Sequence, residues 1–285
     1  MIQIVNGKEI PIKDTAIFVS KLNQQKVHHI GFCGTDREEI QKSIKEDVSE
    51  MMAAVKDGKL IGWIGADTDE DTAEVWGPFV DAEYNRQIAF NMWKKLLEKI
   101  PDEVSNFILF SNRENKLLIE FAEKLQFEQK TDQFVLKFPQ AYSGNLLQSD
   151  LKILKQKDHM AFTRLHDEAF PSTYYSGKEI IERHSQTQKI FVLKDGNRLA
   201  GYVYVEAYPE FRDGSIEFIA VDPECRGKGF GKKLLSGAVH WLFTFDSIDE
   251  IQLTTAADNK SALGLYLSVG FKVENELHYF MKICS

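Results

Sequence analysis

Residues 221–235 read VDPECRGKGFGKKLL, and this stretch decides how the C-terminal half of the chain folds. An apolar strand stops at Pro223, Gly227, Gly229 and Gly231 follow at alternate positions, and a helical pattern then begins. Glycine accepts a positive φ and lets the backbone approach a ligand closely. Unpaired N–H groups and the positive end of the helix dipole meet at the same point. The stretch therefore predicts a strand, an anion-binding loop suited to a phosphate or pyrophosphate, and a helix.

Four basic residues surround these glycines without an acidic residue among them: Arg226, Lys228, Lys232 and Lys233. The spacing excludes two common phosphate loops. A Rossmann fingerprint needs a third glycine where Lys232 stands. A P-loop needs four residues between its glycines and then Lys-Ser or Lys-Thr, which is absent here. A glycine-rich turn that binds nothing is the alternative interpretation.

The chain contains two copies of the same order of strands and helices, and each copy includes a hairpin with an Asp-Gly turn. These are MAAVKDGKLIGWIGA at 52–66 and KIFVLKDGNRLAGYVYV at 189–205. In both copies there follow a strand, a helix, a short apolar strand, a helix that opens at Asn-Lys, and a last strand. The two series are 73–81, 85–100, 106–111, 115–127 and 134–138, against 215–223, 228–243, 250–256, 259–271 and 279–283.

This repetition predicts a mixed α/β fold with two tandem domains. The boundaries are expected at 1–138 for the first domain, 139–150 for a polar linker, and 151–285 for the second domain. The alternative is that two unrelated α/β domains share an order of elements.

A second motif, NKSALGLYLSVGF, begins at Asn259. Asn259 can cap the helix, and Gly270 can end it in left-handed geometry. Ala262 and Tyr266 lie four residues apart and share one face. Tyr266 is therefore a candidate functional side chain, with a core aromatic as the alternative.

Together, V-D-P-E at 221–224, R-x-x-G-x-G at 226–231 and N-x-x-A-x-x-L-Y-x-x-x-G-F at 259–271 resemble the motifs of the GNAT superfamily of N-acetyltransferases. The resemblance covers 151–285. It implies acetyl-CoA as co-substrate and a mixed sheet whose fourth and fifth strands splay apart, the fourth being bulged and lying at 215–221. The residues that it implies for acetyl-CoA binding are Ile219, Ala220, Val221, Arg226, Gly227, Lys228, Gly229, Phe230, Gly231, Lys232, Asn259 and Tyr266.

By the same resemblance, Tyr266 is the general acid beside the thioester sulfur. A tyrosine pKa of about 10 exceeds that of a thiol at about 8.5, so Tyr266 stays protonated at neutral pH and can still donate. Glu217, a carboxylate within an apolar strand, is the candidate base, acting directly or through water. The alternatives for Glu217 are an exposed or ion-paired structural charge, and an amine that loses its proton to water without a dedicated base.

Acceptor recognition in this superfamily usually involves the first two helices, here residues 166–185. Tyr174 and Tyr175 and the acidic residues of this segment are candidates to line an amine site, although a solvated helix face explains the charges equally well. The acidic candidates are Asp167, Glu168 and Glu179.

The N-terminal copy departs from the motifs where chemistry would occur. Residues 85–90, NRQIAF, contain no glycine opposite the anion-binding loop. Ala122 stands opposite Tyr266, and Gln126 stands opposite Gly270. The first domain is therefore predicted to be a degenerate GNAT-like copy without a cofactor.

Composition excludes several classes of protein. The net charge is −8, with 18 basic and 25 acidic side chains in 1–150 and 17 and 18 in 151–285, so no basic surface for nucleic acid is expected. No apolar run has the length of a membrane span, and no export signal is visible at the N-terminus. Three scattered cysteines, Cys33, Cys225 and Cys284, and seven histidines without ligand spacing predict neither disulfides nor a metal site, and favour the cytoplasm.

The function expected from the sequence is transfer of an acetyl group from acetyl-CoA to a primary amine, with a small molecule favoured. The alternatives are a catalytically weak acetyl-CoA-binding regulatory or scaffold protein, and an acetyltransferase of protein N-termini or lysines. The oligomeric state is not predicted.

Overall fold

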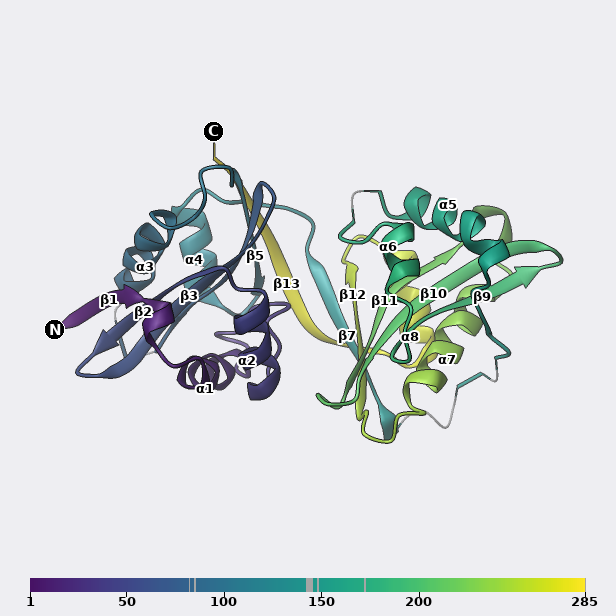
Figure 1. Cartoon of the computed structure of the whole chain (residues 1–285), viewed down its shortest axis with the longest axis horizontal. Coiled ribbons are helices and arrows are strands. Elements are labelled where there is room, and N and C mark those ends of the chain that lie inside the picture. Colours follow the sequence, from purple (N-terminus) through teal and green to yellow (C-terminus); the bar gives the residue numbers. More distant parts are fainter. Residues whose placement is uncertain (82, 85, 142–145, 148, 172, 285) are drawn as a thin grey trace. The chain divides into compact units, whose positions relative to one another are not determined.

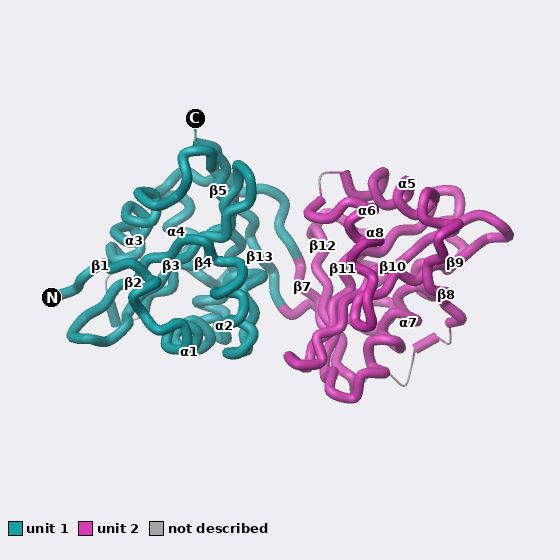
Figure 2. The backbone as a smooth tube through the Cα atoms, in the orientation of Figure 1, with its two compact units in different colours: residues 1–133, 275–285 teal, residues 134–274 magenta. Residues whose placement is uncertain are grey.

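The computed structural model describes residues 1–81, 83–84, 86–141, 146–147, 149–171 and 173–284. The chain forms two compact units. The first unit comprises Met1–Gln133 and Asn275–Ser285, and the second comprises Phe134–Glu274 (Figure 2).

In the first unit, α1 and α2 lie on one side of a sheet, and α3 and α4 lie on the other (Figure 1). The strand order is β1-β2-β3-β4-β5-β13, with β6 paired to β13. The elements before β13 are β1 Ile2–Asn6, η1 Gly7–Glu9, α1 Ile12–Asn23, α2 Arg37–Glu46, β2 Glu50–Lys56, β3 Lys59–Asp69, β4 Thr72–Val80, α3 Gln87–Leu97, β5 Asn106–Asn112, α4 Lys116–Lys124 and β6 Glu128–Gln129.

The second unit repeats this plan, with α5 and α6 on one side of its sheet and α7 and α8 on the other (Figure 1). Its strand order is β7-β12-β11-β10-β9-β8. The elements from β7 onward are β7 Gln133–Pro139, β8 Lys152–Ile153, η3 Gln156–Asp158, α5 His159–Ala169, α6 Gly177–Glu182, β9 Gln188–Asp195, β10 Arg198–Tyr208, β11 Asp213–Val221, η4 Pro223–Cys225, α7 Phe230–Leu242, β12 Glu250–Ala256, α8 Lys260–Val269 and β13 Lys272–Ile283.

Both predicted hairpins form, β2–β3 and β9–β10, with their turns at Asp57-Gly58 and Gly196-Asn197. Asp57 and Gly58 both have positive φ, 52° and 76°, as a tight turn between twisted strands requires. Strand β4 pairs in parallel with β5, and β11 pairs in parallel with β12, whereas the hairpin strands pair antiparallel. The predicted mixed α/β fold with two repeats is confirmed.

The two units exchange their last strands, which the sequence analysis did not predict. Strand β7, expected to end the first domain, pairs with β12, and its Leu136 and Phe138 are buried in the core of the second unit. Residues 277–283 of β13 instead pair with β5, and Phe280 is buried in the core of the first unit. The compact units thus differ from the predicted ranges 1–138 and 151–285. The segment predicted as a linker lies partly outside the described residues, at 142–145 and 148.

The two parallel strand pairs open along their length, which the family resemblance implied for the second unit alone. Strand β11 pairs with β12 only through Asp213–Ser215, and β11 then continues to Val221 without β12. Strand β4 pairs with β5 only through Thr72–Glu74. Each unit therefore has a gap between two splayed strands.

Candidate active site

The glycine loop joins β11 to α7 in the second unit. The Asp222 carboxylate accepts a hydrogen bond from the Glu224 N–H at 3.0 Å and so starts the short turn η4. Gly227 and Gly229 have φ of 76° and 80°, and an added Cβ at either would meet no atom within 4 Å. The Lys233 N–H bonds to the Gly229 carbonyl at 3.2 Å, so the preceding N–H groups at this end of α7 lie outside the helical ladder.

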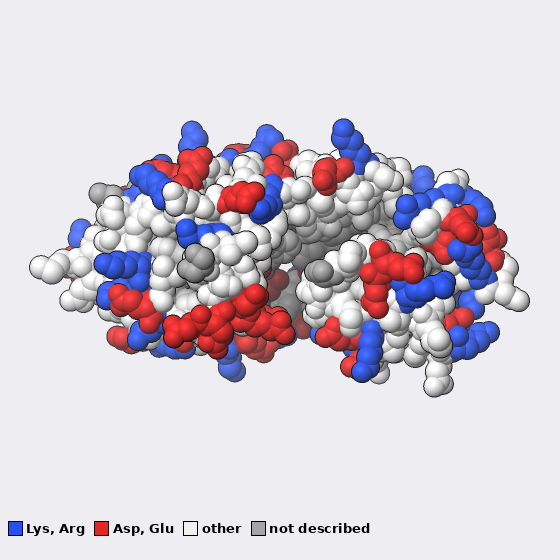
Figure 3. Space-filling view, turned by 90° about the horizontal axis from the view of Figure 1, so that it is seen from above, with Lys and Arg blue, Asp and Glu red and all other residues white. Residues whose placement is uncertain are grey.

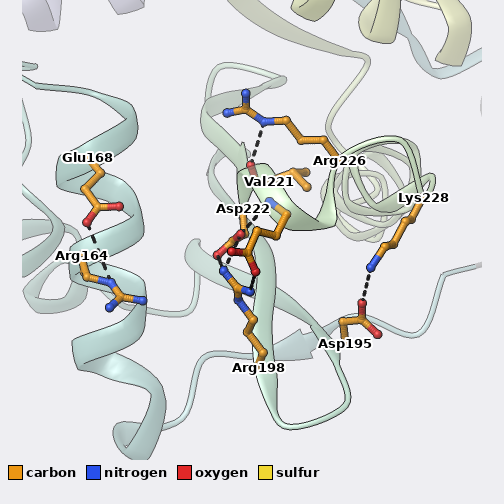
Figure 4. A network of polar contacts seen from close by, with 9 residues as sticks. Arg164, Glu168, Asp195, Arg198, Val221, Asp222, Arg226 and Lys228 are labelled. Carbon is orange, nitrogen blue, oxygen red and sulfur yellow. Dashed lines mark hydrogen bonds and ion pairs between the residues drawn. The ribbon is translucent and has the colours of Figure 1, made fainter.

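Polar contacts hold the side chains around this loop (Figure 4). Lys228 Nζ lies 2.8 Å from Asp195 Oδ2, and Arg226 Nε donates to the Val221 carbonyl at 3.2 Å. Arg198 contacts both carboxylate oxygens of Asp222 at 2.8 Å and also pairs with Glu224. The Lys228 pair is exposed to solvent, where such pairs are weak, so an arriving anion can compete for the ammonium group.

The free edge of β11 faces the gap between β11 and β12. The Asp222 N–H donates to the Ala200 carbonyl of β10, and alternate residues of a strand direct their backbone groups to opposite edges. Ile219 and Val221 therefore direct their N–H and C=O groups toward the gap. Ala220 directs its groups toward β10 instead.

The start of α7 meets helix α8 beside this gap. A Cβ added at Gly231 would lie 3.1 Å from Leu265 Cδ2 and 3.8 Å from Val221 Cγ2. Asn259 caps α8 through a hydrogen bond from the Ala262 N–H at 3.1 Å, and Gly270 ends α8 with φ of 120°. The two predicted motifs thus pack against each other.

Tyr266 of α8 is 7% exposed and packs near Phe271. Burial raises the pKa of the Tyr266 hydroxyl to about 12. This hydroxyl has no hydrogen-bond partner among the described residues, and its oxygen is not completely buried. The Tyr266 hydroxyl is therefore protonated at neutral pH and donates no hydrogen bond to a neighbouring described residue.

Glu217 is the bulged residue of β11. Tyr204 pairs with Phe218 and Val205 with Ile216, so Glu217 has no partner in β10. Its Oε2 accepts a hydrogen bond from the Tyr174 hydroxyl at 2.5 Å. Burial raises the pKa of the Glu217 carboxyl, and hydrogen bonds from Ser215 and Tyr174 partly oppose that rise.

The three acidic residues predicted near the acceptor have structural partners. The Asp167 carboxylate accepts a bond from the Gly177 N–H at 2.9 Å, and Glu179 forms a capping box with Ser176 at the start of α6. Glu168 is exposed and lies 4.0 Å from Arg164 (Figure 4). These contacts explain the charges without a ligand.

Tyr174, by contrast, does contact Glu217, and Tyr175 packs against Tyr174; four residues that were not predicted join them. The Tyr174 and Tyr175 ring centroids are 4.8 Å apart. The whole group, which we call the tyrosine–glutamate cluster, consists of Tyr174, Tyr175, Arg183, Tyr204, Glu206, Tyr208 and Glu217. Glu206 could have been found by the signal that identified Glu217, because it is also a single carboxylate in an apolar strand.

The corresponding gap of the first unit is filled by its own chain. The Gly31 N–H donates to the Phe110 carbonyl at 3.1 Å, and the Asn112 N–H donates to the His29 carbonyl at 3.0 Å. Because the Asn106 N–H bonds to Asp71 beside β4, Phe110 and Asn112 direct their groups to the same edge of β5. Residues 29–31, which we call the plug, therefore lie between β4 and β5.

Side chains of α1 and α4 hold the plug in place. Asn23 accepts a bond from the Ile30 N–H at 2.7 Å and donates to the Gly34 carbonyl at 2.6 Å. Asn115, the counterpart of Asn259, caps α4 and also donates to the His29 carbonyl at 3.3 Å. The loop that carries the plug spans residues 24–36, whereas its counterpart between α5 and α6 spans only 170–176.

Other features of the first unit also differ from the second. Aligned from the start of their parallel pairing, β4 has Pro78 where β11 has Ile219, so the N–H donor is missing there. Ala122 is fully buried in α4, and Gln126 takes the left-handed conformation with φ of 61°. Of the residues opposite the glycine loop, Asn85 lies outside the described residues, and α3 begins at Gln87.

Charge and composition place few constraints on the ligand. Asp and Glu side chains gather in a patch on the visible face of the first unit, whereas both signs are interspersed on the second (Figure 3). Within the described ranges, no three His, Cys, Asp or Glu side chains are grouped as metal ligands. No helix in the described part of the chain is both long enough and apolar enough to span a membrane.

Comparison with known proteins agrees with this geometry. The sequence pattern of the Acetyltransferase (GNAT) family matches residues 22–127 and again 159–271. The chain therefore belongs to the GNAT acetyltransferase family, with two copies of the family's domain.

Among curated proteins, a mycothiol acetyltransferase from Kocuria rhizophila is 28% identical over 131 residues, covering 41% of this chain and 43% of the relative. A spermidine N(1)-acetyltransferase from Vibrio cholerae is 32% identical, covering 33% and 55%. N-alpha-acetyltransferase 30 from Xenopus laevis is 33% identical, covering 38% and 39%. The matched segments thus span about half or less of these relatives.

Solved structures show the same fold along the whole chain. A GCN5-related N-acetyltransferase from Sphaerobacter thermophilus matches with a TM-score of 0.77 and 14% identity, covering 99% of this chain and 95% of that one. A tandem GNAT protein from the clavulanic acid biosynthesis pathway matches with a TM-score of 0.71 and 11% identity, covering 100% and 99%.

Proposed function

We propose that the second unit transfers the acetyl group of acetyl-CoA to a primary amine of a small molecule. The observation that carries the proposal is the glycine loop at the start of α7 beside the free edge of β11. Gly227 and Gly229 leave the space that a pyrophosphate would need, and the N–H groups of α7 point into it. Ile219 and Val221 offer backbone groups that suit the amides of the pantetheine arm.

The residues of the site divide the chemistry between them. The amine nitrogen forms a bond to the acetyl carbon while the carbon–sulfur bond breaks. Glu217 accepts the proton released by the amine, directly or through water, and Tyr266 donates a proton to the departing thiolate. A Tyr266 pKa of about 12 keeps this donor protonated at neutral pH.

A protein N-terminus is the second candidate acceptor. Tyr174, which bonds to Glu217, is 62% exposed, so this side of the site is open to solvent. The relative from Xenopus laevis bears the name of an N-alpha-acetyltransferase. The small amine remains our proposal because the aromatic and acidic side chains of the tyrosine–glutamate cluster surround the Glu217 carboxylate.

The test combines calorimetry with a thiol-release assay. The full chain should bind acetyl-CoA and should release free thiol when small primary amines are added. Release with peptides alone would favour the protein acceptor. Acetyl-CoA binding without thiol release for any amine or peptide would reject acetyl transfer and support a binding protein.

A further inference from the structure

The tyrosine–glutamate cluster contains two carboxylates on neighbouring strands of the second unit. Glu206 lies on β10 and is only 2% exposed, and Glu217 is the bulged residue of β11. Glu206 pairs with Ser215, two residues before Glu217 on the neighbouring strand, and the charge of Glu206 raises the pKa of the Glu217 carboxyl. Two adjacent carboxylates would by themselves suit a ligand with two positive charges.

Glu206, however, already has a complete set of donors. The Tyr204 hydroxyl donates to its Oε1 and the Tyr208 hydroxyl to its Oε2, each at 2.5 Å. Arg183 Nη2 lies 3.2 Å from Oε1 and forms an ion pair with it. A carboxylate that is buried and paired in this way is costly to separate from its partner.

Arg183 is fixed by more than this ion pair. Its guanidinium carbon lies 4.2 Å from the centre of the Tyr175 ring, and its Nε donates to the Tyr204 hydroxyl at 3.3 Å. An aromatic face is a favourable site for a guanidinium group. The positive charge of Arg183 therefore belongs to the cluster.

Glu217 has a different set of contacts. The Tyr174 hydroxyl donates to it, and Tyr174 is the exposed member of the cluster. Within the described part of the chain, Glu217 has no ion-pair partner. The charge of Arg183 lowers the pKa of Glu217, but Arg183 forms its ion pair with Glu206. A cationic group that arrives from solvent at Tyr174 would thus find one carboxylate that is not held in an ion pair.

We propose that Arg183 acts as a built-in cation that occupies Glu206, so that the site accepts an amine with one positive charge and discriminates against diamines. This proposal rests on the proposed function and names its substrate class as aliphatic monoamines. The second ammonium group of a short diamine would meet the guanidinium of Arg183 instead of a free carboxylate. Like charges brought together in this way oppose binding.

The experiment compares butylamine with 1,4-diaminobutane in the thiol-release assay. The measured quantity is the ratio of kcat/KM for the diamine to kcat/KM for the monoamine. In the wild-type chain this ratio should be below one. Arg183→Gln keeps amide donors for Glu206 but removes the charge, and should raise the ratio by about fivefold, the effect of a partly exposed charge pair at its upper range. Arg183→Lys keeps the charge and should leave the ratio near that of the wild type.

Glu206→Gln should change the ratio in the opposite direction from Arg183→Gln. It leaves the charge of Arg183 without its counter-ion, so the ratio should fall below the wild-type value, which a general loss of structure would not produce. A wild-type ratio above one overturns the proposal even if the variants do not fold. An unchanged ratio in folded Arg183→Gln overturns it as well. No thiol release with any amine would instead reject the proposed function itself.

Discussion

Tyr266 is the residue whose role is easiest to isolate, because its hydroxyl has no partner among the described residues while its ring is packed in the core of the second unit. Tyr266→Phe should therefore leave folding and acetyl-CoA affinity nearly unchanged and lower kcat by about 10²-fold, the lower end for general acid catalysis. Steady-state kinetics and calorimetry measure the two effects. Tyr279→Phe in the first unit is the matched control. An unchanged kcat, with chemistry shown to be rate-limiting, would assign Tyr266 to packing alone.

Glu217 predicts a pH dependence. Burial raises its pKa, so as pH falls the base becomes protonated, and therefore inactive, at a higher pH than the usual value of about 4.3. The folded state also holds this proton more tightly than the unfolded chain, so the contribution of Glu217 to the free energy of unfolding falls as pH rises.

A profile of kcat against pH checks this expectation. The wild-type profile should show an acid limb with an apparent pKa above about 4.3, the usual value for a glutamate. Glu217→Gln should lower kcat and remove that limb. The exposed Glu168 offers a control, because Glu168→Gln should keep the limb. A limb that persists unchanged in Glu217→Gln would assign the base to another group or to water.

Single residues show which parts of the site could be predicted from the sequence. Motif spacing was sufficient to select the glycine loop and Tyr266, because it requires only local order. Glu206 was missed although it sits in its strand much as Glu217 does, since its importance depends on Arg183, 23 residues away in sequence. The acidic residues Asp167 and Glu179 were selected by charge alone, and in the structure both carboxylates accept hydrogen bonds from backbone N–H groups.

At the scale of elements, the loop between β11 and α7 is the feature that separates the two units. Its Gly229 has φ of 80° and open space on the side where a Cβ would project, so a β-branched residue there would bring both backbone strain and bulk to the expected pyrophosphate site. Gly229→Val should abolish acetyl-CoA binding in calorimetry. Gly196→Val is the matched control, because Gly196 also has a positive φ and open surroundings but lies in the β9–β10 turn.

The plug extends this prediction to the number of sites. Residues 29–31 occupy the β4–β5 gap, and Pro78 removes a backbone donor from its edge. Calorimetry on the wild-type chain should therefore give one acetyl-CoA per chain. Two equivalent sites, or residual tight binding by Gly229→Val while Gly196→Val is normal, would contradict the assignment of the site to the second unit.

The plug and the strand exchange could not be predicted from the repeat. The hairpins, and the two helices that follow the hairpin in each copy, were predicted because they depend on local patterns. The strands FVLKF and YFMKI carry the same apolar alternation, so the pattern fits either core equally well. The plug carries no strand pattern of its own, because a single bridge at Ile30 and two backbone bonds place it.

For the whole molecule, the exchange determines which part of the chain can fold alone. The second unit is continuous from Phe134 to Glu274 and contains β7, whose Leu136 and Phe138 are fully buried in its core. A fragment of 145–285 would lack β7 and would carry residues 275–285, whose partner β5 is absent. Loss of even one large core side chain costs about 2–5 kcal/mol, out of a typical domain stability of about 5–15 kcal/mol.

Residues 134–274 should accordingly form a soluble fragment that unfolds cooperatively and binds acetyl-CoA, whereas 145–285 should be insoluble or unfold at a much lower temperature. Both fragments would be compared by thermal unfolding and calorimetry against the full chain. Adding residues 134–144 back to the second fragment tests β7 by itself, and should recover most of the lost stability even though the unpaired last strand remains. Equal stability of 134–274 and 145–285 would contradict a structural role for the exchanged strand. A stable 134–274 fragment that binds acetyl-CoA with the affinity of the full chain would place the whole cofactor site in the second unit.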